Sequence, residues 1–240
     1  AAASGMIGVF ALMRRMSLAA DAISHIALPG LGLAFLYKIN PLIGGAATLF
    51  LGTILIWNIE SRTKIPTETI IGVIFSLSLA IGSLVTPRED LIEALFGGVS
   101  RLSAAEFSGT ITLAILIIGL TLYFKNQFII QMTSPDLAVV TGLKVKRLNL
   151  YFLLLFSLTV ILGLKFLGAL LMGSLIIIPA AAAKNIGWNT NSMLGLAVSI
   201  GILSVIGGFF ISNSYHFTLG PTVIVLAGLI FLMSLLPRKN

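Results

Sequence analysis

The chain has 240 residues, of which 58% are hydrophobic and only 10% are charged. Its mean hydropathy of +1.09 excludes an ordinary soluble domain, because roughly 25% of the residues in soluble proteins are charged. The net charge of +7 does not indicate nucleic-acid binding, since the basic residues are spread between apolar segments and form no basic module. Without cysteine there are neither disulfides nor thiolate metal ligands. The composition therefore predicts an all-α, polytopic transmembrane helical bundle.

Eight or nine apolar segments are separated by polar intervals with turn or cap residues, such as Asn40-Pro41 and Asn189-Thr190. A spanning helix needs ~20 mainly apolar residues, although shorter ones are tolerated. The run 149–183 would form a single helix ~50 Å long, so we interpret it as a hairpin interrupted at residues 163–165. The chain starts without a Met, and we expect one domain over 1–240 with a truncated first span. The segments are approximately 1–13, 19–37, 41–58, 69–86, 107–124, 149–164, 166–183, 192–212 and 218–236.

The second segment carries an acid and an imidazole in the run Asp21-Ala22-Ile23-Ser24-His25. Residues four apart lie on one face of a helix, so these two side chains should meet. Ionisable groups at membrane depth cost ~2.5 kcal/mol or more and usually face a bundle interior or a wet cavity, where they mark an ion or substrate route. Carboxylate and imidazole are ligands for first-row divalent metals, most often zinc, but two ligands do not complete a site. The alternative is that Asp21 and His25 only bond to each other or to neighbouring backbone.

Two positions predict irregular helices. Pro29 and Gly30 follow His25 closely, and we expect them to break the helix and free backbone carbonyls beside a cavity. Pro179 predicts a second kink, for which gating is the functional interpretation and irregular packing the alternative.

Small residues also recur at helix-packing spacing, as in Ala169 with Gly173 and Ala197 with Gly201. In membrane bundles this spacing brings helix backbones close together. We interpret both pairs as tight interhelical contacts without a further function.

The distribution of Lys and Arg predicts the orientation, because cytoplasmic loops of membrane proteins are enriched in both. If 125–148 is cytoplasmic and each segment crosses once, eleven of the 15 basic residues lie inside and four outside. His25 is then ~15 Å from the inner surface, near the middle of the membrane. The inner residues are Arg14, Arg15, Arg62, Lys64, Lys125, Lys144, Lys146, Arg147, Lys184, Arg238 and Lys239; the outer ones are Lys38, Arg88, Arg101 and Lys165. The acids Glu89, Asp90, Glu93 and Glu106 fall in the outer interval between the fourth and fifth segments.

The predicted cytoplasmic interval contains a complete set of helix start and stop signals between Thr133 and Gly142. A helix of under two turns between them is not stable alone in water, so it must lie against the bundle or against a separate soluble subunit. A capped connector is the alternative interpretation. The signals are Ser134 for the N-cap, Pro135 for the first helical position, Asp136 for the positive end of the dipole and Gly142 for the left-handed C-terminal position; Leu137, Ala138 and Val140 lie between them.

Four fragments of the chain carry a family resemblance when they are taken together. They are RRMS at 14–17 followed by DAISHIALPG, SPDLAVVTGLKVKRL at 134–148, KFLGALLMGSLIIIPAAAAK at 165–184 and GPTVIVLAGLIFL at 220–232. In this order they resemble the membrane permease of bacterial metal-uptake ABC transporters, the zinc/manganese family, over essentially the whole chain. The resemblance implies a homodimeric, multi-pass protein of the bacterial cytoplasmic (inner) membrane, surrounded by lipid. It also implies a pair of cytoplasmic ABC ATPase subunits and an extracytoplasmic metal-binding protein as partners.

The same resemblance assigns roles to particular residues. It implies that 134–142 is the helix that couples to the ATPase, and Asp21 and His25 fall on the family's D-x-x-[SA]-H motif, which is associated with the metal path. No cofactor is expected to stay bound, since the metal is transported. The amino-acid sequences of the coupling segment and of RRMS are more similar to those of zinc members than to those of manganese or iron members. Some zinc members, however, carry a histidine in the span 69–86, and this chain has none there. Manganese and iron therefore stay open, as does a contact of incoming metal with the outer-loop residue His216.

The chain contains no G-x-x-x-x-G-K-[ST] phosphate loop, so we expect a transport subunit rather than an enzyme, with ATP hydrolysed by a separate subunit. Two other classes of membrane protein are less consistent with the sequence. An intramembrane metalloenzyme is disfavoured because no H-E-x-x-H occurs and the chain has two histidines in all. A gradient-driven carrier is disfavoured because no second copy of the DAISH or SPDLA run is found, whereas such carriers often contain paired repeats.

Overall fold

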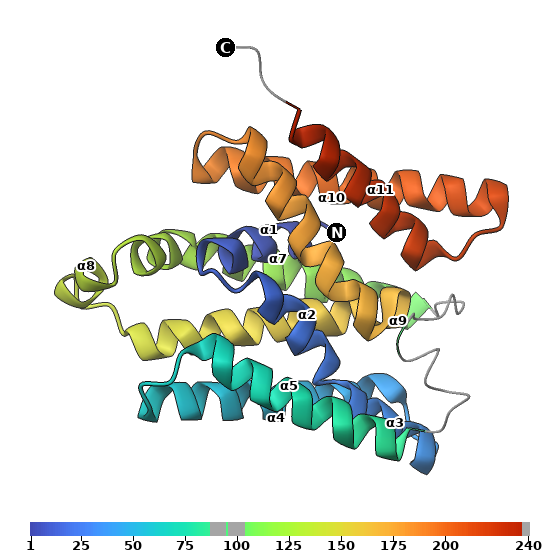
Figure 1. The fold of residues 1–240 in the computed structure, drawn as a ribbon, viewed down its shortest axis with the longest axis horizontal. Coiled ribbons are helices and arrows are strands. Elements are labelled where there is room, and N and C mark those ends of the chain that lie inside the picture. Colours follow the sequence, from blue (N-terminus) through green and yellow to red (C-terminus); the bar gives the residue numbers. More distant parts are fainter. Residues whose placement is uncertain (87–94, 96–103, 237–240) are drawn as a thin grey trace.

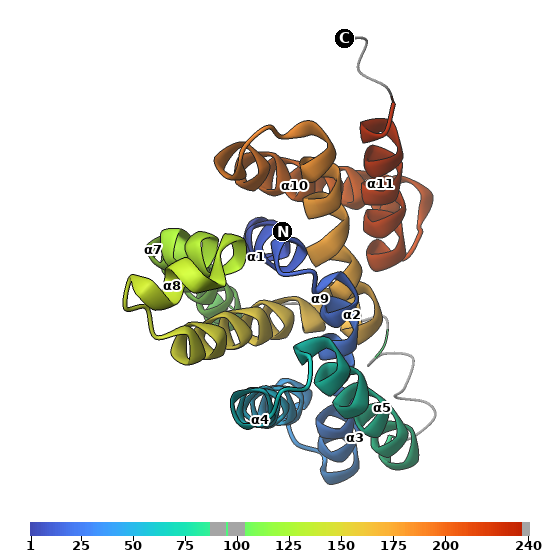
Figure 2. The ribbon, with the colours of Figure 1, turned by 60° about the vertical axis from the view of Figure 1, so that its left-hand side comes forward.

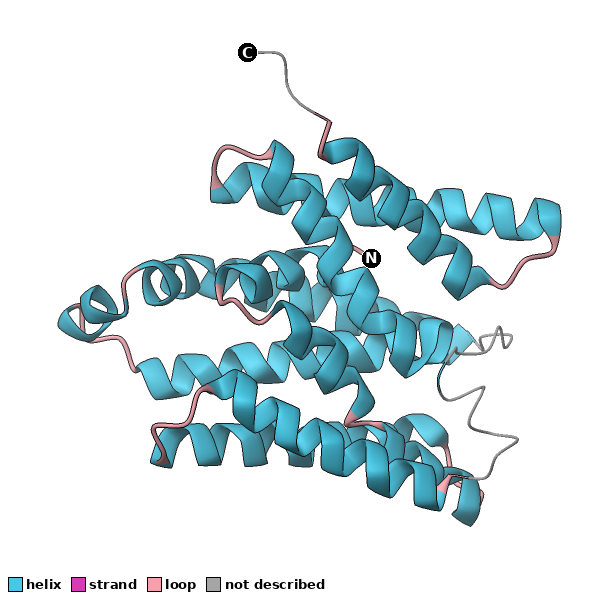
Figure 3. Ribbon diagram, viewed as in Figure 1, coloured by secondary structure: helices cyan, strands magenta, loops and turns pink. Residues whose placement is uncertain are grey.

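Every regular element in the described part of the chain is a helix (Figures 1 and 3). The computed structural model describes residues 1–86, 95 and 104–236. Seven helical stretches there are long and apolar enough to cross a membrane, and two shorter apolar helices accompany them, which confirms the predicted polytopic bundle. The helices are α1 (Ala2–Met13), α2 (Ser17–His25), α3 (Leu28–Tyr37), α4 (Pro41–Arg62), α5 (Thr67–Val85), α7 (Ala104–Thr133), α8 (Pro135–Val140), α9 (Val145–Ile186), α10 (Thr190–Tyr215) and α11 (Leu219–Ser234).

The predicted caps begin two of the long helices. The side chain of Asn40 accepts a hydrogen bond of 3.0 Å from the backbone N–H of Leu42 at the start of α4. The side chain of Asn189 accepts one of 2.7 Å from the N–H of Ser192 at the start of α10. Such bonds satisfy donors that the first helical turn leaves unpaired, so these boundaries are set locally.

The apolar run that was predicted to form a hairpin is α9, which changes direction at Gly168. This residue has φ 69° and ψ 178°, a conformation open essentially to glycine alone. The first limb, Val145–Leu164, and the second limb, Leu167–Ile186, are each long enough to span a membrane. The hairpin is thus confirmed, but its break lies beyond the predicted residues 163–165. Pro179 lies inside the second limb, where the dihedral angles stay helical.

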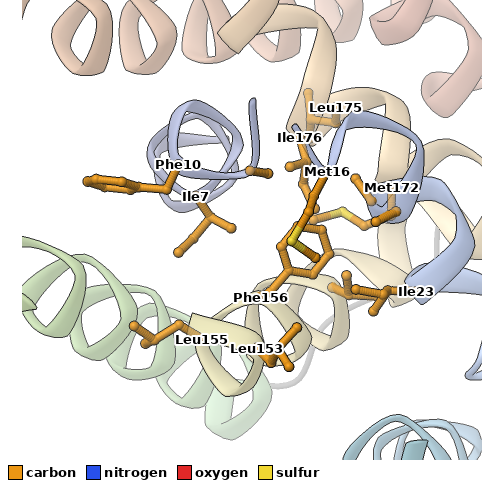
Figure 4. Packing of buried hydrophobic residues seen from close by; sticks show 14 of the residues in the cluster. Ile7, Phe10, Met16, Ile23, Leu153, Leu155, Phe156, Met172, Leu175 and Ile176 are labelled. Atoms are coloured by element: carbon orange, nitrogen blue, oxygen red, sulfur yellow. The ribbon is translucent and has the colours of Figure 1, made fainter. Parts of the chain in front are cut away.

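The short helix α1 lies at the centre of the bundle, between α7, α9 and α10 (Figure 2). A Cβ atom at Gly5 would lie 2.6 Å from the carbonyl oxygen of Ala197 in α10, and one at Gly8 would overlap the carbonyl oxygen of Ile176 in α9. Residues without a side chain at these points let the backbones touch. Apolar side chains of α1, α2 and both limbs of α9 fill the space between these helices (Figure 4), including Ile7, Phe10, Ile23, Phe156, Met172 and Ile176.

The α1–α2, α4–α5 and α9–α10 links, which adjoin basic residues that were predicted to lie inside, are at the end of the bundle that carries α8 (Figure 1). Hydrogen bonds join elements there: Lys146 donates to the carbonyl of Ser61 at 2.9 Å, and Lys125 donates to the side chain of Asn191 at 3.0 Å. The α3–α4 link, which holds the predicted outer residue Lys38, lies at the opposite end (Figure 1). The predicted inner and outer positions thus lie at opposite ends of the bundle, and the assignment of one end to the cytoplasm stays a prediction. Arg88, Glu89, Asp90, Glu93, Arg101, Arg238 and Lys239 lie outside the described residues.

Candidate functional site

Helix α2, which carries Asp21 and His25, lies directly against the second limb of α9. A Cβ atom at Gly173 would lie 2.5 Å from the Cα of Asp21, so the two backbones are in contact there. One turn away, the Ser24 hydroxyl is 2.6 Å from the carbonyl oxygens of both Asp21 and Ala169, and its single proton can be donated to either. The tight contact predicted from the spacing of Ala169 and Gly173 is confirmed, and it holds the helix of the candidate site.

The second small pair has the same structural role elsewhere. The backbone of Ala197 lies against Gly5, and a Cβ atom at Gly201 would lie 3.3 Å from the carbonyl oxygen of Ala1. Both residues therefore face the N-terminal part of the chain, and the predicted packing role is confirmed here too.

The acid and the imidazole meet on one face of α2, as their spacing predicts. His25 Nε2 lies 3.9 Å from Asp21 Oδ1, a distance beyond that of a hydrogen bond. The His25 side chain is 7% exposed and that of Asp21 is 50% exposed. Nδ1 of His25 is buried and makes no hydrogen bond to a described residue, and the ring centroid lies 5.5 Å from that of Phe75 in α5. The ring nitrogens of His25 and the carboxylate oxygens of Asp21 are therefore not used in a hydrogen bond to each other.

No third side chain completes the set within the part of the chain that the structure describes: no group of three or more His, Cys, Asp or Glu occurs there that could hold a metal ion. Four protein ligands are typical of structural zinc sites, which hold the ion permanently. A pair of ligands suits an ion that must bind and then leave.

The helix interruption next to His25 lies slightly earlier than predicted. Helix α2 ends at His25 and α3 begins at Leu28, so the break is at residues 26–27. Pro29, in the first turn of α3, has no N–H with which to continue the helical bonding onto the carbonyl of His25. Gly30 lies inside α3, where a Cβ atom would overlap the carbonyl oxygen of Gly44 in α4. Gly30 therefore allows close packing and does not break the helix.

The second candidate region is α8, which begins and ends where the sequence predicts. Ser134 occupies the N-cap position and Pro135 starts the helix, although the Ser134 side chain makes no capping hydrogen bond. Gly142 has φ 75°, and its N–H donates to the carbonyl of Val139 at 3.0 Å, while the N–H of Leu143 donates to that of Ala138 at 3.0 Å. These two bonds form a Schellman cap, which only a residue that tolerates positive φ completes without strain.

The side chains of α8 divide between the bundle and the outside. Ala138 is fully buried, whereas Leu137, Val139 and Val140 are 52%, 67% and 85% exposed. Asp136 is exposed in the first turn of the helix. An exposed apolar surface on a six-residue helix at the basic end of the bundle is a surface suited to a protein partner.

Several residues around these regions were missed by the sequence reasoning. Phe75, which lies beside His25, resembles any other residue of an apolar helix and gives no local signal. Ser24 belongs to the predicted Asp21–His25 run, but nothing in the sequence indicates its hydrogen bond to Ala169. The ion pair of Arg14 with Glu60, at 3.1 Å and with both side chains 14% exposed, did leave a signal, since Glu60 is an acid within the spanning helix α4. An ionisable residue in a spanning helix is a candidate functional residue by default.

A membrane bundle with a buried imidazole and a carboxylate on an interrupted helix, and with a capped apolar helix projecting at the basic end, has the features of a transport protein. Comparison with known proteins agrees with this class. Residues 1–238 match the family described as the ABC 3 transport family. The chain belongs to the ABC 3 transport family, and it is a multi-pass component of the bacterial cytoplasmic membrane that takes part in transport and is not an enzyme.

Relatives named for zinc and for manganese transport both match almost the whole chain. The chain is 33% identical over 240 residues to the "High-affinity zinc uptake system membrane protein ZnuB" of Haemophilus influenzae, covering 98% of this chain and 92% of the relative. It is 32% identical over 237 residues to the "Manganese transport system membrane protein MntC" of Listeria monocytogenes, covering 97% of this chain and 85% of the relative. The predicted resemblance to the zinc/manganese family is thus confirmed.

Solved structures give the same picture. The structure titled "PsaBC from Streptococcus pneumoniae in complex with Fab" superposes with a TM-score of 0.85 at 28% identity, covering 99% of this chain and 87% of the other. The structure of "An inward-facing conformation of a putative metal-chelate type ABC transporter" superposes with a TM-score of 0.73 at 15% identity, covering 97% of this chain and 83% of the other. The second likeness concerns the fold alone.

Proposed function

We propose that this chain is the permease subunit of an ATP-driven importer of divalent metal, with zinc as the preferred ion. The observation that carries the proposal is the buried imidazole of His25 beside the half-exposed carboxylate of Asp21 on the interrupted helix α2. Family membership and relatives named for zinc or manganese uptake support the same function.

The preference for zinc rests on ligand chemistry, because the named zinc and manganese relatives are equally similar at 33% and 32% identity. Imidazole nitrogen is a common ligand of zinc, whereas sites for manganese are built mainly from oxygen. One imidazole beside one carboxylate therefore favours zinc. Manganese is the alternative, and iron would use the same two side chains.

In the proposed mechanism, an extracytoplasmic binding protein delivers the ion, and Asp21 and His25 hold it transiently during passage. The remaining coordination positions are filled by water or by a second copy of this chain. Helix α8 docks on an ABC ATPase through Leu137, Val139 and Val140, and closure of two ATPases opens the metal path alternately to each side of the membrane. The chain's own contribution is to place two ligands, too few to trap the ion, on the path.

Reconstitution of the complete transporter in liposomes tests the proposal. Uptake of radioactive zinc should require ATP and the binding protein, and excess unlabelled zinc should compete better than manganese or iron. Stronger competition by manganese would make it the transported ion. Uptake that does not depend on ATP and stops when the proton gradient is dissipated would overturn the proposal.

A further inference from the structure

A partly buried polar cluster at the basic end of the bundle connects α8 with the helix that carries Asp21 and His25. Its centre is Glu60, near the end of α4. Oε1 of Glu60 lies 3.1 Å from Nη2 of Arg14, accepts a hydrogen bond of 2.6 Å from the Thr67 hydroxyl and accepts one of 3.2 Å from the Asn149 amide. Asn149 in turn accepts a hydrogen bond from the side chain of Gln131. We define these five residues as the Glu60 cluster.

The two outer members of the Glu60 cluster lie on either side of α8. Gln131 is in the last turn of α7 and Asn149 is in the first turns of α9, so the chain between them consists of α8 and its two connections. The bond between their side chains closes this segment into a loop at its base. A displacement of α8 therefore acts directly on Asn149 and, through it, on Glu60.

The opposite end of the cluster is attached to the candidate metal path. Arg14 lies in the turn between α1 and α2, three residues before α2 begins. Arg15, which follows it, has φ 59°, a left-handed conformation that non-glycine residues rarely adopt. The guanidinium of Arg14 is fixed by Glu60 and also lies 5.2 Å from the centroid of the Phe152 ring. The start of α2 is thus held by a charge rather than by packing alone.

The pair of charges is incompletely satisfied. Nη1 of Arg14 and Oε2 of Glu60 are both buried and make no hydrogen bond to a described residue. Burial lowers the pKa of Arg14 and Glu60 opposes this shift, but a guanidinium stays charged in proteins. A buried polar network with unused donors and acceptors is costly and is a reason to expect a second arrangement in which they are paired.

From this geometry we propose that the Glu60 cluster is the positioning element that links the movement of α8 to the movement of α2. Displacement of α8 by its partner changes the Gln131–Asn149–Glu60 contacts, and the pairing of Glu60 with Arg14 carries the change to the start of α2. The proposal rests on the proposed function, because it takes α8 as the ATPase-docking helix and α2 as part of the metal path. Arg14 and Glu60 act through other residues and do not touch the ion.

The test is the ratio of metal taken up to ATP hydrolysed by the complete transporter in liposomes. The double variant Arg14→Met/Glu60→Met removes both charges at similar volume, an exchange that buried ion pairs often tolerate. We expect the complex to assemble and hydrolyse ATP within about twofold of wild type, and uptake per ATP to fall by about fivefold or more. The matched control is Asn185→Ala, which removes the 2.9 Å bond to Ser234 between α9 and α11 outside the cluster and should leave the ratio unchanged.

A second double variant keeps the proposal testable if the first one does not fold. Asn149→Leu with Gln131→Leu cuts the same connection at its α8 end without replacing a charged residue, and it should lower the ratio of metal taken up to ATP hydrolysed as well. The proposal is overturned if an assembled variant takes up as much metal per ATP hydrolysed as wild type, which includes the case in which uptake and hydrolysis fall in proportion. It is also overturned if both double variants fail to assemble. If wild-type transporter takes up no metal, it is the proposed function that has failed, so the two failures are distinct.

Discussion

The backbone of Asp21 touches the second limb of α9 at Gly173, where a Cβ atom would lie 2.5 Å from the Cα of Asp21. The position of the acid, and with it that of His25 one turn later, is therefore set by the absence of a side chain on a helix far away in the sequence. This contact connects packing in the bundle with the geometry of the proposed metal path.

Gly173→Ala should push α2 away from α9 and reduce metal uptake. Overpacking in well-packed interiors costs about 1–3 kcal/mol, so a lower thermal unfolding temperature of the purified permease is also expected. The control is Gly119→Ala in α7, where a Cβ atom meets nothing within 4 Å. Equal uptake and equal melting temperatures for the two variants would show that the contact at Gly173 does not position the site.

His25→Ala should abolish uptake while the complex stays assembled and competent for ATP hydrolysis. The variant removes one of two candidate ligands, and we expect uptake to fall by more than about tenfold, the loss typical even of residues that only support a metal site. Ser199→Ala is the control, because Ser199 is exposed in α10 and its hydroxyl bonds to the carbonyl of Gly195 in the same helix. Undiminished metal accumulation by His25→Ala would remove this residue from the mechanism.

Zinc binding to the purified permease should weaken as the solution is made more acidic. An imidazole must be neutral to bind metal, so protons compete with the ion for His25, and the affinity is expected to fall over a titration from neutral to acidic pH. Calorimetric titration of the permease with zinc alone measures this dependence. The His25→Ala variant should show weak binding with a flatter pH profile over the same range, and identical profiles would contradict the assignment.

Val140→Asp should prevent copurification of the ATPase with the permease. Val140 is 85% exposed at the end of α8, and a charge there would have to be desolvated in an apolar contact. Ile65→Asp is the control, because Ile65 is 46% exposed in the α4–α5 link and lies outside α8. Loss of the ATPase from both variants, or from neither, would argue against α8 as the docking element.

The parts of the site that the sequence predicted correctly are those with a local cause. The spacing of Asp21 and His25 places them on one face of any helix. The cap of α8 depends on Gly142, whose φ of 75° suits glycine and whose bonds are made to residues within one turn. The helix break was predicted at Pro29 and Gly30 but lies at residues 26–27, between α2 and α3. The difference arises because a proline interrupts the hydrogen bonding of the turn that precedes it.

The sequence by itself determined that the chain crosses a membrane, which end is basic, and that Asp21 and His25 share one face of a helix, because apolar length, charge and helical spacing are properties of neighbouring residues. Only the tertiary structure decided that Ser24 bonds to Ala169, 145 residues away, and that Glu60 bonds to Asn149, 89 residues away. In an apolar helix, the residues around a glycine or a single acid do not indicate which residue of another helix it contacts. The partner is selected when helices pack and a buried charge or a bare backbone must find a matching surface.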